Sequence, residues 1–125
     1  MIFKILFVNE HSDLHESSSD LQARGFNVQN TSPGNGFIKK LQKFDPDVIV
    51  FDSVKIGEKN EHTYHSLRQV TSAPILVLSV VDLPGIVEKT LDRGADEYLI
   101  KPVSPNILAA RINALARRTP NSANA

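Results

Sequence analysis

The 125-residue sequence contains no cysteine and no apolar run that approaches the roughly 18 residues of a membrane-spanning helix. The absence of cysteine excludes a disulfide framework and thiolate chemistry. The first ten residues, MIFKILFVNE, lack the small-residue cleavage site of a signal peptide. These absences favour a cytoplasmic protein that does not act at a membrane.

The chain also lacks an excess of charge of either sign, because 14 basic residues balance 14 acidic ones. A domain that binds nucleic acid directly normally carries an excess of basic residues, so this chain is a poor candidate for binding DNA by itself. Its length suits one domain, and its 41% hydrophobic and 22% charged residues are typical of a globular protein.

Five short apolar segments are typical of strands that are buried on both faces of a parallel sheet. They cover residues 2–8, 26–29, 48–51, 75–79 and 98–100, and the second is the weakest. The stretches between and after them are long enough for helices, the first over residues 12–24. The last helix is the clearest, because Ser104 suits an N-cap and Pro105 suits the first helical position.

Apolar residues at helical spacing predict which side of each later helix faces the core. These residues are Phe37, Ile38 and Leu41; Tyr64, Leu67 and Val70; Ile86, Val87 and Leu91; and Ile107, Leu108, Ile112 and Leu115. Five alternating strand and helix units predict an α/β fold, a flavodoxin-like (βα)5 domain with a five-stranded parallel sheet in the order 2-1-3-4-5.

Polar residues gather where the predicted strands end. Asn9 and Glu10 follow the first strand, Asp52 follows the third, Ser79 ends the fourth and Lys101 follows the fifth. The carboxyl ends of parallel strands lie at one edge of a sheet, where ligands bind. Each residue alone would pass as an ordinary loop or surface group, but together they indicate one site.

The motifs KILFVNE, PDVIVFD and PILVLS, and above all GADEYLIKPVSPNILAARINALARR, carry a family resemblance. Residues 3–118 resemble the receiver domain of two-component response regulators, the CheY-like family. The last stretch is most similar to receivers of OmpR/PhoB-type winged-helix transcription regulators. We therefore expect a receiver domain over residues 1–118, with residues 119–125 as a tail or the start of a linker to an effector domain.

The resemblance implies that Asp52 accepts a phosphoryl group from a phosphohistidine of a sensor histidine kinase, as a step in a phosphorelay that controls an output such as transcription. Lys101 and Ser79 would bind the phosphoryl oxygens, and Tyr98 would be the aromatic switch residue. The Lys101–Pro102 peptide bond would be cis. Any enzymatic activity would be limited to self-phosphorylation and self-dephosphorylation.

The resemblance also implies a Mg²⁺ site. Glu10 and Asp52 would be side-chain ligands, the backbone carbonyl of Val54 a third ligand, and Asn9 a ligand through water. Mg²⁺ prefers oxygen ligands and retains several waters, which suits this set.

In the same subfamily the surface formed by the fourth helix, fifth strand and fifth helix makes a symmetric homodimer. A DNA contact would come only through an effector domain outside this chain. The candidate interface residues are Lys89, Asp92, Asp96, Glu97, Ile107, Arg111, Arg117 and Arg118.

Several positions depart from the family pattern. Asn9 stands where an acid is usual, Ile56 and Asn60 stand where proline and glycine are usual, Val80 replaces a small residue and Ile107 replaces an acid. The loss of a charge at Asn9 should weaken the Mg²⁺ site, and Val80 should narrow access to the acceptor. The alternative hypothesis is a pseudo-receiver, a protein-interaction module that works without phosphorylation.

Two further interpretations are weaker. A flavodoxin-like cofactor site would need a glycine fingerprint, but PGNG at residues 33–36 does not match one and favours a turn. The histidine pairs His11–His15 and His62–His65 lack a clear third metal ligand, so surface or capping roles are favoured.

Overall fold

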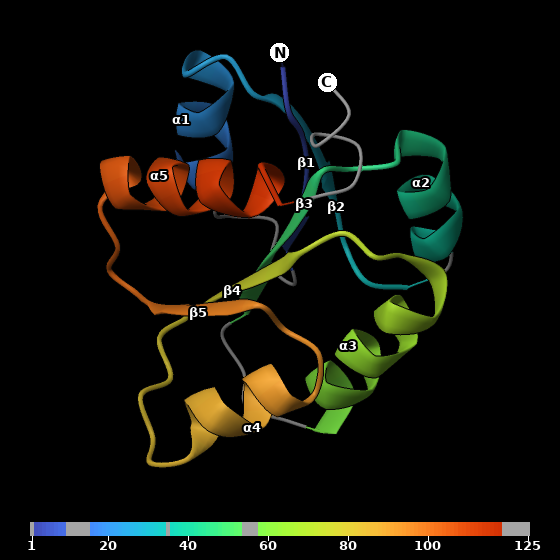
Figure 1. Cartoon of the computed structure of the whole chain (residues 1–125), viewed down its shortest axis with the longest axis vertical. Helices are drawn as coiled ribbons and strands as arrows, with labels where there is room; N and C mark the ends of the chain where they lie inside the picture. Colours follow the sequence, from blue (N-terminus) through green and yellow to red (C-terminus); the bar gives the residue numbers. More distant parts are fainter. Residues whose placement is uncertain (1, 10–15, 35, 54–57, 119–125) are drawn as a thin grey trace.

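The sheet sits between two layers of helices (Figure 1). The computed structural model describes residues 2–9, 16–34, 36–53 and 58–118. The strands run parallel in the order β2-β1-β3-β4-β5, which confirms the predicted fold. The elements are β1 (Lys4–Asn9), α1 (Glu16–Ala23), β2 (Asn27–Thr31), α2 (Phe37–Phe44), β3 (Val48–Ser53), α3 (Glu58–Val70), β4 (Ile75–Ser79), α4 (Ile86–Asp92), β5 (Glu97–Ile100) and α5 (Pro105–Ala116).

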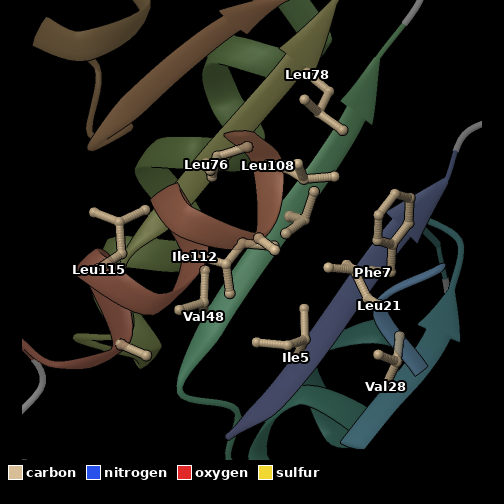
Figure 2. Packing of buried hydrophobic residues seen from close by; sticks show 13 residues of the cluster. Ile5, Phe7, Leu21, Val28, Val48, Leu76, Leu78, Leu108, Ile112 and Leu115 are labelled. Carbon is tan, nitrogen blue, oxygen red and sulfur yellow. The ribbon is translucent and has the colours of Figure 1, made fainter. Parts of the chain in front are cut away.

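The two faces of the sheet bury two separate apolar clusters. Alternate residues of a strand point to opposite faces, so β1 sends Ile5 and Phe7 toward α1 and α5, and Leu6 and Val8 toward α2 and α3. Figure 2 shows the first cluster, where Ile112 of α5 lies over the central strands. No helix in the described part of the chain has both the length and the apolarity needed to cross a bilayer.

Helix α5 begins as the sequence predicts. The Ser104 side chain accepts a hydrogen bond of 3.1 Å from the backbone N–H of Ile107, and Pro105 occupies the first helical position. Leu108, Ile112 and Leu115 are buried against the sheet (Figure 2), but Ile107 is 51% exposed. The prediction that Ile107 shares their buried face is therefore wrong, because it projects from the first turn toward solvent.

Three other predicted core positions are partly exposed. Ile38 of α2, Val70 of α3 and Leu91 of α4 lie at the borders of their helices' buried faces, and each exposes more than a third of its surface. Phe44 is buried at the end of α2 instead. The predicted boundaries also shift by one or two residues at β1, β2, β3 and β5, and residues 12–15 of the first predicted helix lie outside the described residues.

Candidate functional site

Asp52 and Asn9 lie side by side at the carboxyl edge of the sheet. They are register partners between β3 and β1, so their backbones are adjacent. Val48 and Val50 face α5, and Asp52, two residues further along β3, points to the same side of the sheet. Asp52 is only 5% exposed, so its carboxylate is held at a fixed position at the end of a buried strand.

Lys101 supplies the positive charge at this carboxylate. Its Nζ donates a hydrogen bond to Oδ1 of Asp52, and its backbone N–H donates to the carbonyl of Ser79 at 2.8 Å. The backbone contact ties the segment after β5 to the end of β4. The Lys101–Pro102 peptide bond is cis, as the resemblance implied.

Ser79 and Tyr98 are connected through the backbone of a single residue. The Ser79 hydroxyl accepts a hydrogen bond of 3.1 Å from the N–H of Val81, while the Tyr98 hydroxyl donates to the carbonyl of Val81 at 2.8 Å. The Tyr98 ring packs against the apolar cluster under α2 and α3. A movement of the segment after β4 would therefore change the contacts of both the Ser79 hydroxyl and the Tyr98 side chain.

A cavity of about 430 Å³ opens beside the Asp52 carboxylate. Asp52, Lys101 and Pro102 line it from the sheet edge, and Ser17 and Val80 line it from the flanking segments. Val80 is 56% exposed at this opening. Ser17 and Val81 were not identified from the sequence. The placement of a helix after the first strand could have indicated Ser17, but Val81 acts through backbone groups that leave no sequence signal.

The oxygen atoms at this edge fit a Mg²⁺ ion. Asp52 offers a carboxylate, and the Asn9 side chain beside it is 6% exposed, with neither its Oδ1 nor its Nδ2 bonded to any partner that the structure describes. A buried amide of this kind calls for a ligand or an ordered water. Glu10 and Val54, the other expected ligands, lie outside the described residues, and the described residues alone contain no cluster of three acidic or histidine ligands.

The other positions that depart from the family pattern are only partly described. Ile56 lies outside the described residues, and Asn60 lies in the first turn of α3. The two histidine pairs cannot be placed for the same reason. His11 and His15 lie outside the described residues, as does the side chain of His62.

The candidate interface residues lie on or next to three neighbouring elements, and the contacts of Asp96 within the chain are described. Oδ2 of Asp96 accepts hydrogen bonds from Arg68 at 2.9 Å and from the N–H of Ile75 at 2.8 Å. The others follow the expected surface: Lys89 and Asp92 on α4, Glu97 on β5, Ile107 and Arg111 on α5, and Arg117 and Arg118 at its end.

Comparisons with known proteins agree with this geometry. The family model of the response regulator receiver domain matches residues 5–113. The response regulator protein GraR of Staphylococcus saprophyticus is 32% identical over 116 residues, which are 91% of this chain and 51% of that protein. The chain thus spans about half the length of the curated relatives it matches.

Solved structures give the same result. A two-component response regulator from Clostridium difficile matches with a TM-score of 0.82 and 25% identity, over 93% of this chain and 97% of that one. The chemotaxis protein CheY4 of Vibrio cholerae matches with a TM-score of 0.77 and 26% identity, over 92% of this chain and 99% of that one. With the family match and the sheet order in agreement, the chain belongs to the response regulator receiver domain family of two-component signalling.

Proposed function

We propose that Asp52 accepts a phosphoryl group from the phosphohistidine of a sensor histidine kinase. The observation that carries this proposal is the contact between a buried carboxylate at the end of β3 and the Lys101 ammonium. A carboxylate is a competent nucleophile for phosphoryl transfer, and the ammonium is placed where negative charge must be held.

The chemistry is a displacement at phosphorus. A carboxylate oxygen of Asp52 attacks the phosphorus, the new O–P bond forms an acyl phosphate, and the P–N bond to the donor imidazole breaks. The leaving nitrogen keeps the electron pair of the broken bond and takes a proton from solvent. Lys101 pairs with the phosphoryl oxygens as the group arrives, and the Ser79 hydroxyl exchanges its bond from Val81 for one that it donates to the phosphoryl group.

Mg²⁺ would be held by Asp52 and, through water, by Asn9, with Glu10 and the Val54 carbonyl as the remaining expected ligands, and it would neutralise charge on the phosphoryl oxygens. Within the described chain, Asp52 positions the attacking oxygen and Lys101 balances the charge that transfer brings into the pocket. Pro102 and Val80 limit the entry of water from the cavity opening.

The expected output is a shift between two arrangements of the surface formed by α4, β5 and α5. If Ser79 turns toward a phosphoryl oxygen, its bond from Val81 is lost, and the same residue's carbonyl holds Tyr98. A bound phosphoryl group would therefore bias the position of the Tyr98 ring and the segment after β4. We expect this surface to mediate homodimerisation, and an effector domain outside this chain to act on DNA.

The test is phosphorylation by a small phosphodonor with Mg²⁺, followed by intact mass measurement. The wild-type chain should gain the mass of one phosphoryl group, and Asp52→Asn should gain none. Asp45→Asn is a matched control because Asp45 lies in the left-handed region after α2, which asparagine also tolerates, and it should behave as wild type. An unmodified wild-type chain, or equal modification of Asp52→Asn, would refute the proposal.

A second candidate function, a phosphorylation-independent interaction module, is favoured by one observation. The uncharged Asn9 amide stands beside Asp52, where the family pattern has an acid, and a weaker metal site would disable transfer. In that case the wild-type chain would stay unmodified and yet bind its partner equally well as wild type and as Asp52→Asn.

A further inference from the structure

A second cavity lies at the opposite edge of the sheet from Asp52. It has a volume of about 470 Å³, and it lies between the start of β1, the edge strand β2 and helix α2. Lys4 lines it at the first position of β1, whereas Asn9 at the last position pairs with Asp52. Lys4 and Asn9 are five steps apart along the strand, which is about 17 Å, so the cavity is a separate site.

The lining of this cavity is strongly basic. Three lysines contribute to it, Lys4 from β1 and Lys40 and Lys43 from α2, and its described lining residues include no carboxylate. Across the described residues, none of these three ammonium groups forms an ion pair. Since the whole chain is neutral, this is a local concentration of charge.

The two carboxylates that follow Lys43 in the sequence, Asp45 and Asp47, do not line the cavity. Oδ2 of Asp47 accepts the backbone N–H of Lys4 at 2.8 Å, in the gap between β1 and β3. Asp45 is exposed at the end of α2 and does not line the cavity. Among the described residues, the positive charge of this cavity therefore has no counterion.

Neutral donors and an aromatic ring complete the lining. Asn27 and Gln29 are exposed, two residues apart on β2, and so lie on the same face of that strand. The Lys4 ammonium lies 5.8 Å from the centre of the Phe44 ring. Ammonium and amide groups together offer many N–H donors, which favour a ligand rich in charged acceptor oxygens.

Side chains already contact part of the outer edge of β2. The backbone N–H of Asn27 donates a hydrogen bond to the carbonyl of Phe3, on the side of β1. Because backbone groups alternate along a strand, those of Val28 and Asn30 point to the outer side of β2, away from β1. Their carbonyls are already engaged, that of Val28 by Gln22 at 3.5 Å and that of Asn30 by the Lys40 ammonium at 2.6 Å. An added peptide strand would have to compete with both side chains for these carbonyls, so a small ligand suits this place better.

We propose that this cavity binds a small molecule that carries two or more phosphate groups. The cavity falls in the size range of small-molecule sites, and its three ammonium groups can each pair with a different phosphate group of one ligand. Lys40 keeps two of its three donors after bonding to Asn30, and Lys43 is exposed and free to turn toward the ligand. Nucleoside polyphosphates and inorganic polyphosphate share this chemistry.

The experiment titrates the full chain with tripolyphosphate, adenosine triphosphate and adenosine, without Mg²⁺ and at about 0.15 M salt, where distant surface charges are screened. Backbone amide resonances are followed by NMR. Both phosphate compounds should shift the resonances of β2 and α2 and leave those around Asp52 unmoved, and adenosine should shift none. Tighter binding of adenosine triphosphate than of tripolyphosphate would assign the site to nucleotides, and the reverse to inorganic polyphosphate.

Matched variants locate the charge that matters. Lys43→Gln should weaken binding about threefold, and Lys40→Gln with Lys43→Gln about tenfold, as expected for partly exposed ion pairs. Lys39→Gln removes the same charge from the same helix outside the cavity and should change affinity less than twofold. If the double variant fails to fold, the affinity of Lys43→Gln alone tests the proposal, because Lys43 is exposed and its replacement should not disturb folding.

Three results would overturn the proposal. These are no shifts with either phosphate compound, shifts confined to the surroundings of Asp52, or equal weakening by Lys39→Gln and Lys43→Gln. Binding of long polyanions such as nucleic acid without binding of tripolyphosphate would also reject a small-molecule site. Asp52→Asn should bind as wild type does, so the result is independent of the phosphoacceptor test.

Discussion

At the scale of single residues, Asn9 determines how much negative charge lies next to Asp52 at the carboxyl edge of the sheet. The amide is buried beside Asp52, and among the described residues nothing bonds to either of its polar atoms. An acid in its place would add a second negative charge next to Asp52. Two neighbouring carboxylates repel each other until a cation binds between them. An asparagine at position 9 therefore lowers the affinity for metal but avoids a repulsion that would destabilise the metal-free chain.

Asn9→Asp should therefore tighten Mg²⁺ binding on the order of tenfold, since a full charge at contact distance in a partly buried site contributes more than 1 kcal/mol. The same change should lower the free energy of unfolding when Mg²⁺ is absent. A fluorescence or calorimetric titration measures the first effect and chemical denaturation measures the second. Asn106→Asp, which adds the same charge at an exposed position of α5, should leave Mg²⁺ affinity unchanged; equal affinities for wild type and Asn9→Asp would contradict the charge argument.

Val80 should control how fast small molecules reach Asp52. Its exposed side chain lines the cavity over the acceptor, and Val80→Ala removes two methyl groups from that opening. We expect phosphorylation by a small donor and hydrolysis of the acyl phosphate both to become about threefold faster, which is a barrier change of roughly 0.7 kcal/mol. Time-resolved intact mass measurement follows both rates.

Val70→Ala, at another partly exposed valine on α3, is the control for Val80→Ala and should alter neither rate. If Val80→Ala left both rates at the wild-type values, the opening would not limit access.

Sequence patterns predicted strand ends better than they predicted side-chain contacts. The positions of Asp52, Ser79 and Lys101 at one edge follow from five strands that run parallel, and the structure confirms this arrangement. The bond from Lys101 to Asp52 depends on side-chain directions that spacing does not specify. The helical stripe wrongly placed Ile107 on the buried face, because a residue at the border of such a stripe is buried or exposed according to its tertiary neighbours, whereas its exposure is compatible with the interface role that the resemblance implied.

Arg68 joins three elements at the end of the molecule away from the acceptor site. Its guanidinium donates to the carbonyls of Gly94 at 3.0 Å and Ala73 at 2.8 Å and to the Asp96 carboxylate at 2.9 Å. These contacts link α3 to the segments before β4 and β5. Gly94 allows the close approach, because its φ is +122° and an added Cβ would lie 3.0 Å from Cγ of Arg68.

Gly94→Ala should lower the free energy of unfolding by about 1–3 kcal/mol, since it combines an unfavourable backbone conformation with a tight contact. Gly25→Ala is the matched control, because Gly25 has a φ of +99° but open space around an added Cβ. The difference between the two variants isolates the contact with Arg68. Urea denaturation measures each value, and the extra loss at Gly94 should disappear in an Arg68→Ala background; an unchanged loss there would show that the contact is not its cause.

At the scale of the whole molecule, the surface of α4, β5 and α5 combines exposed apolar residues with charges of both signs. Leu91, Ile100 and Ile107 are each more than a third exposed. The structure places one of these residues on each of the three elements, beside the candidate ionic residues. This composition suits an interface that can pair with its own copy.

We expect the phosphorylated chain to dimerise through this surface and Arg111→Glu to weaken the dimer about tenfold, since reversal of a charge turns an attraction into a repulsion across the two-fold axis. Sedimentation velocity over a concentration series measures the change. Lys39→Glu, a charge reversal on α2, should leave the dimer intact. A monomer at every concentration, with and without phosphodonor, would remove this surface from the mechanism.

Val81 joins Ser79 to Tyr98 through its own peptide groups, the N–H toward the serine and the carbonyl toward the tyrosine. Every amino acid has this carbonyl, and every one except proline has the N–H. These two hydrogen bonds can therefore form with almost any side chain at position 81, so that side chain can vary while both contacts are kept. If Asp52 is phosphorylated as proposed, the connection from Ser79 to Tyr98 would run through main-chain groups that nearly every amino acid supplies.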